Sequence, residues 1–212
     1  MQGVGVSTVI GFPHGTTTTA TKAAEAAEAV RAGAAELDMV LNIGWLRSGR
    51  VDEVRDDIAA VVRAATAAAA GGAAPVKVIL ECAYLSDAEK VAGCRAAAAA
   101  GAAFVKTSTG FATPPAGRAV GSTPADLRLM RAHTAPGVEV KASGGIRTLD
   151  ALLEAVACGA TRIGTTSTSA IAEEAARRDP RGEGLSVPSA VASGSNSSGG
   201  AATASTAAAA AY

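Results

Sequence analysis

The sequence predicts an α/β protein built on a parallel sheet. Short runs rich in β-branched residues alternate with longer Ala- and Glu-rich runs, and six such strand–helix units follow one another. Strict alternation is typical of parallel strands joined by right-handed helical crossovers. The 212 residues are 49% hydrophobic, enough for one sizeable core, and with 3% aromatic residues this core is expected to consist of Ala, Val, Leu and Ile.

The predicted strands are short apolar segments, and turn-forming or charged residues end them. The first is rich in Val and stops at Pro13-His14-Gly15, a strong turn signal. The third begins after Pro75 and ends at Glu81. The six predicted strands cover residues 4–12, 36–43, 76–80, 102–106, 138–141 and 162–164.

The segments between the strands have the apolar spacing and the terminal residues of helices. Ser86 and Glu89 form a capping box, and Thr123 precedes a proline in the first helical turn. Glycines follow several of these segments, as is common where a helix ends. The predicted helices cover residues 22–31, 51–70, 86–100, 123–133, 148–157 and 169–178.

A faint repeat relates three of the units. Helices end at Gly33, Gly101 and Gly159, and each glycine is followed by Ala and then by a strand. The residues five positions after these glycines are Asp38, Lys106 and Gly164. If the three strands enter the sheet in like register, these residues lie at a similar height near its carboxyl end, where parallel sheets bind ligands.

Lys106 stands at the end of a buried apolar strand and is followed by a turn of small hydroxyl residues and Gly110. Burying the charge of a lysine at such a position destabilises the fold unless the lysine is paired or has a chemical function. A partly desolvated lysine loses its proton more easily, and its neutral amine can attack a carbonyl carbon to form a Schiff base. The alternative is a lysine whose stem packs while its ammonium group reaches water.

Lys141 ends the neighbouring strand in the same way. Two nearby ammonium groups repel each other, so one is more easily neutral, and we predict one lysine as nucleophile and the other as its electrostatic partner. Asp38, in an apolar strand, either pairs with a lysine to relay protons or forms a structural ion pair. Glu81 ends the intervening strand and is predicted either to orient a lysine or to be structural.

Small residues follow the last two predicted strands. The pair Gly144-Gly145 follows one strand, and the run from Gly164 to Ser167 follows the next, each before a helix. Backbone N–H groups and hydroxyls at the start of a helix suit a phosphate group. Two such turns on consecutive last strands resemble the phosphate site of many (β/α)8 barrels.

Charge, cysteines and hydropathy limit the classes of function. Lys plus Arg and Asp plus Glu both total 19, and nucleic-acid-binding motifs are absent, so no nucleic-acid partner is predicted. Cys82, Cys94 and Cys158 lack metal-ligand spacing and are predicted to be reduced core residues of a cytoplasmic protein. No run approaches the ~20 apolar residues of a membrane span, and no P-loop or Gly-x-Gly-x-x-Gly is present.

Four segments combine these residues in a specific order and spacing: FVKTSTGF at 104–111, VKASGGIR at 140–147, ELDMVLN at 36–42 and VKVILE at 76–81. The segments GFPHG at 11–15 and RIGT at 162–165 agree with them. Together they resemble the deoxyribose-phosphate aldolase family, over about residues 4–178. The resemblance implies a TIM (β/α)8 barrel and a class I aldolase without metal or cofactor. It also implies reversible cleavage of 2-deoxy-D-ribose 5-phosphate to D-glyceraldehyde 3-phosphate and acetaldehyde.

The resemblance implies roles for the residues already singled out. Lys106 is implied as the Schiff-base lysine, Lys141 as the second lysine that favours the neutral amine, and Asp38 as the carboxylate of a proton relay. The implied phosphate site consists of Gly110, Gly144, Gly145, Gly164, Thr166 and Ser167. The expected partner is a small phosphosugar, with neither nucleic acid nor membrane, and a homo-oligomer is compatible with the family.

Barrels of this family have eight strands, whereas six are predicted here. We therefore expect residues 1–180 to form an incomplete barrel that lacks the first two strand–helix units. Residues 181–212, rich in Ser, Gly and Ala, are expected to form a low-complexity, disordered tail. Two other functions stay open: an inactive fragment that keeps the signature residues, and a barrel that binds phosphate without covalent chemistry.

Overall fold

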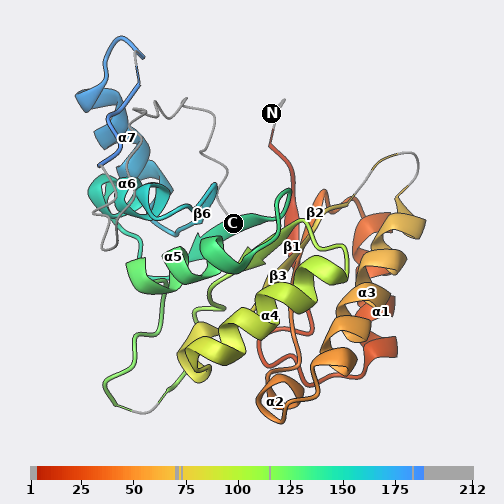
Figure 1. Cartoon of the computed structure of the whole chain (residues 1–212). Helices are drawn as coiled ribbons and strands as arrows, with labels where there is room; N and C mark the ends of the chain where they lie inside the picture. Colours follow the sequence, from red (N-terminus) through yellow and green to blue (C-terminus); the bar gives the residue numbers. More distant parts are fainter. Residues whose placement is uncertain (1–3, 70–71, 73, 115, 183, 189–212) are drawn as a thin grey trace.

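The computed structural model describes residues 4–69, 72, 74–114, 116–182 and 184–188. Six parallel strands form one sheet, in which each strand pairs with the next one along the chain (Figure 1). The predicted α/β fold with a parallel sheet is confirmed. The strands are β1 (Ser7–Ile10), β2 (Glu36–Val40), β3 (Val76–Ile79), β4 (Phe104–Lys106), β5 (Glu139–Ser143) and β6 (Arg162–Gly164).

Helices connect the strands, and capping side chains define where several of them begin. The capping box at Ser86 and Glu89 is present, and Thr123 accepts a hydrogen bond of 3.1 Å from the backbone N–H of Asp126. Both predicted helix starts are therefore confirmed. The helices are α1 (Thr19–Arg31), α2 (Ile43–Arg47), α3 (Val51–Ala68), α4 (Asp87–Ala99), α5 (Pro124–His133), α6 (Leu149–Ala157) and α7 (Thr168–Arg178), with a 3-10 turn η1 (Cys82–Tyr84).

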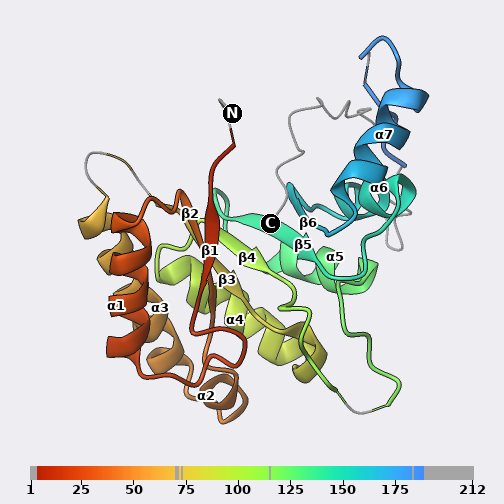
Figure 2. The same ribbon diagram turned by 180° about the vertical axis from the view of Figure 1, so that it is seen from behind.

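The two faces of the sheet carry different chemistry. Successive residues of a strand point to opposite faces, so a strand can bury apolar and charged residues on separate sides. In β2, Leu37 and Met39 join the apolar cluster that the helices share, whereas Glu36 and Asp38 form ion pairs on the other face. Seen from behind, β1 stands in front of the sheet with no helix over it (Figure 2).

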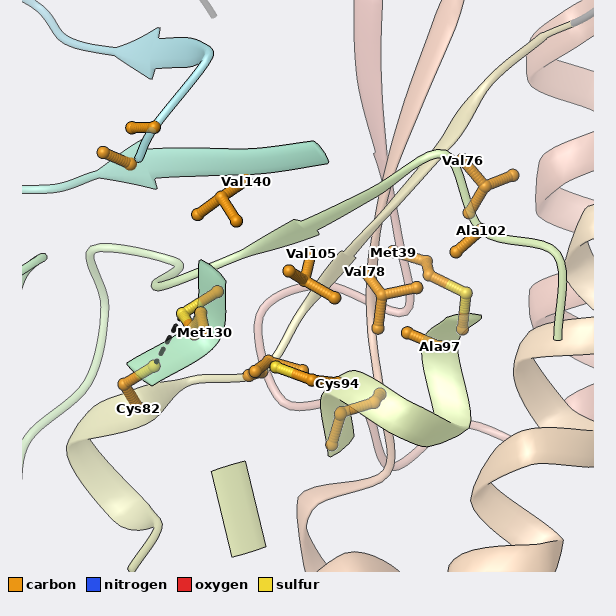
Figure 3. Packing of buried hydrophobic residues seen from close by; sticks show 14 of the residues in the cluster. Met39, Val76, Val78, Cys82, Cys94, Ala97, Ala102, Val105, Met130 and Val140 are labelled. Carbon is orange, nitrogen blue, oxygen red and sulfur yellow. Dashed lines mark hydrogen bonds between the residues drawn. The ribbon is translucent and has the colours of Figure 1, made fainter. Parts of the chain in front are cut away.

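The apolar face packs against helices on the outside of the sheet. Val78, Val105 and Val140 come from three neighbouring strands, and Cys94 and Ala97 come from α4; all five are 0% exposed (Figure 3). Burial of a valine side chain stabilises the fold by about 1.5–3 kcal/mol. The three free cysteines are all buried, as predicted for small core residues.

A contact between β6 and β2 shows that the sheet is curved. Arg162 Nη1 lies 3.1 and 2.9 Å from the two carboxylate oxygens of Glu36, although three strands separate β6 from β2. Neighbouring strands lie about 4.8 Å apart, so a flat sheet would hold these two strands roughly 19 Å apart. The charged face is therefore concave, and the six strands form the partial barrel that the sequence predicts.

Several segment boundaries differ from the predicted ones, and two of the differences have a clear physical cause. The strand expected at 36–43 ends at Val40, because Asn42 caps a short helix that was not predicted: its side-chain oxygen accepts a hydrogen bond of 3.0 Å from the N–H of Trp45. The first strand, expected over 4–12, pairs only over Ser7–Ile10, since Gly11 turns the chain away with a φ of 61°.

The predicted tail begins at residue 181, and residues 189–212 lie outside the described part of the chain. Within the described range 184–188, Leu185 and Val187 pack, partly buried, against the apolar cluster. No helix of the described ranges is long and apolar enough to cross a membrane.

Helices α1 and α3 pack side by side, and a buried ion pair joins them (Figure 1). Lys22 Nζ on α1 lies 2.7 Å from Asp57 Oδ2 on α3, and the two side chains are 0% and 1% exposed. Thr19 donates a hydrogen bond of 2.7 Å to the other Asp57 oxygen. Gly11 leaves room for the lysine, because a Cβ at Gly11 would lie 2.9 Å from Lys22 Cε.

Replacing Asp57 by Ala is expected to destabilise the fold by about 3–5 kcal/mol, because the ammonium group of Lys22 stays buried without a counter-charge. The double variant Lys22→Met/Asp57→Leu removes both charges and is expected to lose much less stability. Urea unfolding followed by circular dichroism measures both free energies of unfolding. Equal losses would show that the unpaired charge is not what destabilises the single variant.

Candidate active site

The three residues predicted to be catalytic meet on the concave face of the sheet. Lys106 is the last residue of β4, Lys141 lies in β5 and Asp38 lies in β2. Asp38 Oδ2 lies 2.6 Å from Lys106 Nζ and 2.8 Å from Lys141 Nζ. One carboxylate oxygen thus bridges two lysine nitrogens. The three residues are buried, with 3%, 7% and 0% exposure for Asp38, Lys106 and Lys141.

The strands reach this arrangement through a stagger that the repeat did not predict. Lys106 pairs with Lys141 across the β4–β5 ladder, so both side chains project from the same level. Asp38 instead pairs with Lys77, whereas Lys106 pairs with Ile79, two residues further along β3. The expectation of a common height for Asp38 and Lys106 was therefore wrong. A curved sheet tilts and staggers its strands, and this brings residues at different ladder positions into contact.

The charges around Asp38 favour its ionised form. Burial alone would raise its pKa, but the positive charges of Lys106, Lys141 and Lys77 together hold the pKa at about 2. Burial lowers the pKa of Lys141 to about 8; Asp38 opposes this shift, and the charges of the two other lysines add to it. A substantial share of Lys141 therefore carries a neutral amine near pH 8, while Asp38 stays charged.

Lys77 completes the group, and no role was predicted for it. Its Nζ lies 2.8 Å from Asp38 Oδ1 and 2.8 Å from Glu36 Oε2, and the side chain is 0% exposed. The available signal was a lysine at an alternate position of an otherwise apolar strand. That signal is weak, because only the tertiary structure shows that Glu36, from β2, and Arg162, from β6, meet beside it.

Glu81 holds the turn that follows Lys106. Its backbone is left-handed, with a φ of 58°, and its carboxylate accepts hydrogen bonds from the backbone N–H of Thr109 over 3.2 Å and from the Thr109 hydroxyl. Burial raises the pKa of Glu81. Its Oε1 and the hydroxyl of Ser108 are the buried side-chain oxygens without a partner in the described part of the chain.

The predicted Gly144-Gly145 turn requires glycine for two reasons. Both residues have positive φ, 85° and 84°, which side chains other than Gly rarely adopt. The loop after β4 also packs closely on Gly144, because a Cβ at Gly144 would lie 3.0 Å from Gly121 Cα. Ser122 in this loop donates two hydrogen bonds of 3.1 Å to the Gly144 carbonyl oxygen. The long loop 112–122 thus ends against this turn.

The other residues of the predicted phosphate site lie at the ends of β4 and β6. Gly110 is exposed with a φ of 88°. Gly164 lies beside a lysine of the site, since a Cβ there would be 3.4 Å from Lys141 Cε. Thr166 is exposed. Ser167 stands directly before α7, but its side chain accepts no hydrogen bond from the first backbone N–H groups of that helix. An anion is favoured at such a helix start.

Among the described residues, no group of three His, Cys, Asp or Glu side chains is placed to hold a metal ion. The ion pairs of the concave face join lysines and Arg162 to the carboxylates of Glu36 and Asp38. Lysine nitrogens, and carboxylates that are already ion-paired, are poor metal ligands.

Most of the chain matches a known family model. The model described as DeoC/LacD family aldolase matches residues 2–174. The chain belongs to this family. The fold and the lysine pair described above are thus those of an aldolase family member, and the resemblance noted in the sequence is confirmed.

Relatives within the family are similar over most of this chain. The deoxyribose-phosphate aldolase of Rhodospirillum rubrum is 51% identical over 173 residues, which are 82% of this chain and 68% of the relative. Two solved structures also match. The aldolase QR15 is 39% identical with a TM-score of 0.75, over 85% of this chain and 76% of QR15. The other is a tetrameric deoxyribose phosphate aldolase from Aeropyrum pernix. The second is 35% identical with a TM-score of 0.70, over 81% of this chain and 68% of that one.

Asp38→Asn is expected to lower the pKa of Lys141 further below about 8, because the carboxylate charge stabilises the protonated lysine. The ¹³Cε chemical shift of Lys141, followed by NMR across a pH series and assigned with Lys141→Arg, gives the midpoint at which Lys141 loses its proton without any reagent having to reach this buried side chain. This midpoint should move to lower pH, while that of Lys90, which pairs with Asp126 outside the site, stays unchanged. A raised midpoint would contradict the described ion pair.

Proposed function

We propose that this chain is a deoxyribose-phosphate aldolase, which cleaves 2-deoxy-D-ribose 5-phosphate reversibly to D-glyceraldehyde 3-phosphate and acetaldehyde. The observation that carries the proposal is the pair of buried lysines, Lys106 and Lys141, bridged by one oxygen of Asp38. A Schiff-base aldolase needs a neutral amine, a second positive group and a proton carrier close together. The names of relatives at about 50% identity support this substrate.

The reaction begins when the neutral amine of Lys106 adds to the C1 aldehyde of the open-chain sugar. The hydroxyl group of this adduct takes a proton from the Lys141–Asp38 pair and leaves as water, and the nitrogen lone pair then forms a positively charged iminium group at C1, which can accept an electron pair. Lys106 takes this role because it ends its strand, where its side chain is 7% exposed, whereas Lys141 is 0% exposed. Lys141, whose pKa is about 8, exchanges protons readily at working pH.

Cleavage then breaks the bond between C2 and C3. The C3 hydroxyl loses its proton through a water held by Asp38 and Lys141. The electrons of the C2–C3 bond form the C1–C2 double bond of an enamine, while the π electrons of the C1–N bond move to nitrogen. D-Glyceraldehyde 3-phosphate leaves with the new C3 carbonyl. The enamine takes a proton at C2, and water hydrolyses the resulting iminium to acetaldehyde and free Lys106. Every proton removed is thereby returned.

The phosphate group of the substrate is assigned to the turns after β4, β5 and β6. Gly144 and Gly145 have positive φ, and without a side chain they let the backbone come close to a ligand. The start of α7 adds a favourable dipole. Gly110, Gly164, Thr166 and Ser167 complete the proposed phosphate site. A module that binds phosphate without covalent chemistry would have no use for two bridged lysines, so we favour the aldolase.

Two further features complete the proposal. The free and buried cysteines suit a reducing compartment, so we place the reaction in the cytoplasm. The relative from Aeropyrum pernix is tetrameric, and this supports a homo-oligomer for the present chain as well.

Treatment with sodium borohydride in the presence of 2-deoxy-D-ribose 5-phosphate is expected to trap a covalent adduct on Lys106, because borohydride reduces the iminium to a stable amine. Peptide mass spectrometry locates the adduct, and Lys106→Met serves as the control that should remain unlabelled. An adduct found only on Lys141 would reverse the assigned roles. If the folded chain gave no adduct, the Schiff-base mechanism would be refuted.

Lys141→Leu and Asp38→Asn are each expected to lower kcat by about 10²–10⁴-fold with a smaller effect on KM, because both residues act on protons during the reaction. Steady-state assays of acetaldehyde release measure both constants. Turnover close to that of the wild-type chain in both variants would show that these residues are structural only.

A further inference from the structure

Lys77 lies within hydrogen-bond distance of three acceptors and has no exposed surface. Its Nζ is 2.8 Å from Asp38 Oδ1, 2.8 Å from Glu36 Oε2 and 3.3 Å from the hydroxyl oxygen of Ser7. A lysine ammonium group has three N–H donors, so these acceptors satisfy it completely. Lys77 therefore has no donor left for a substrate, and its effect on the site must pass through its partners.

The partner that matters is Asp38, because Lys77 occupies one of its two oxygens. The other oxygen, Oδ2, bridges Lys106 and Lys141 at 2.6 and 2.8 Å. A carboxylate without this restraint can rotate about its Cβ–Cγ bond and place both oxygens on a single lysine. The bridge between the two amines would then be lost.

Lys77 is itself held from the far side of the concave face. Glu36 accepts hydrogen bonds from Arg162 over 2.9 and 3.1 Å, and the Arg162 guanidinium lies 5.3 Å from the ring centroid of Phe104. These residues come from β2, β4 and β6, so strands on both sides of β3 fix the position of Lys77. These contacts keep the Lys77 ammonium group at one position relative to the Asp38 carboxylate.

We infer that Lys77 is a positioning residue. It fixes the Asp38 carboxylate so that one oxygen bridges Lys106 and Lys141, and its charge adds to the positive potential at the amine pair. The inference rests on the proposed aldolase function, in which these amines and Asp38 carry the reaction. Lys77 itself touches neither substrate nor reacting atoms.

Lys77→Met tests the inference, because methionine fills similar space without charge or donor. The expected result is a fall in kcat of about 10²-fold with a smaller change in KM, as a displaced catalytic group of this kind produces. The titration midpoint of Lys141, measured by NMR, should also rise above about 8, because a neighbouring positive charge that lowers it is gone. This shift is opposite in sign to that expected for Asp38→Asn.

Two conservative variants separate charge from geometry and remain informative if Lys77→Met fails to fold. Lys77→Arg keeps the charge and should hold the Lys141 midpoint near its wild-type value. Lys77→Gln keeps a donor to Asp38 without charge, so it should raise the midpoint but retain more turnover than Lys77→Met. If both variants matched the wild type in kcat and midpoint, the inference would be overturned.

Lys22→Met is the matched control. Lys22 is also 0% exposed and pairs with an aspartate at 2.7 Å, but it joins α1 to α3 outside the concave face. It should lose stability without a shift of the Lys141 midpoint. Equal effects of Lys22→Met and Lys77→Met on kcat, KM and midpoint would show a structural role only. An inactive wild-type chain would refute the proposed function. The titration midpoints, which need no turnover, would still decide the inference.

Discussion

The carboxylate of Asp38 is the interaction on which the inner face of the sheet depends. Three lysines lie within 2.6–2.8 Å of its two oxygens, and all of them are buried. Buried ammonium groups without counter-charges would cost several kcal/mol each, so the lysines are tolerable only as a connected group. The cations of the concave face still outnumber the carboxylates of the network, and this excess attracts an anionic substrate. The cations are Lys77, Lys106, Lys141 and Arg162, and the carboxylates are Glu36 and Asp38.

The fold stabilises these buried charges by placing them on one face of the sheet and the apolar core on the other. Parallel strands are usually apolar on both faces. Here β2 alternates between apolar residues that face the helices, such as Leu37 and Met39, and carboxylates that face the concave side. A shift of one residue in the pairing would place Asp38 and Lys77 under the helices. The ion network therefore specifies the register as well as the chemistry.

The proposed binding site is formed by the loops at the carboxyl ends of the strands. Glu81 keeps a left-handed backbone that only surrounding structure can maintain, and it ties the turn after Lys106 through Thr109. Gly121 and Gly144 approach each other so closely that neither tolerates a side chain. These turns are held by hydrogen bonds and close packing, and they sit where ligands of parallel sheets bind.

Much of this protein follows from its sequence because the signals are local. Apolar periodicity and capping residues such as Ser86 predicted the order of strands and helices. The sequence also predicted Lys106 and Lys141 as neighbours, and they pair across the β4–β5 ladder. The expectation that Lys141 ends its strand was wrong, because β5 continues to Ser143. The stagger between Asp38 and Lys106, the contact of Glu36 with Arg162 and the role inferred for Lys77 were decided only by tertiary structure. The physical reason is that they depend on strand tilt and sheet curvature, which arise from the packing of all strands together and leave no signal in any single segment.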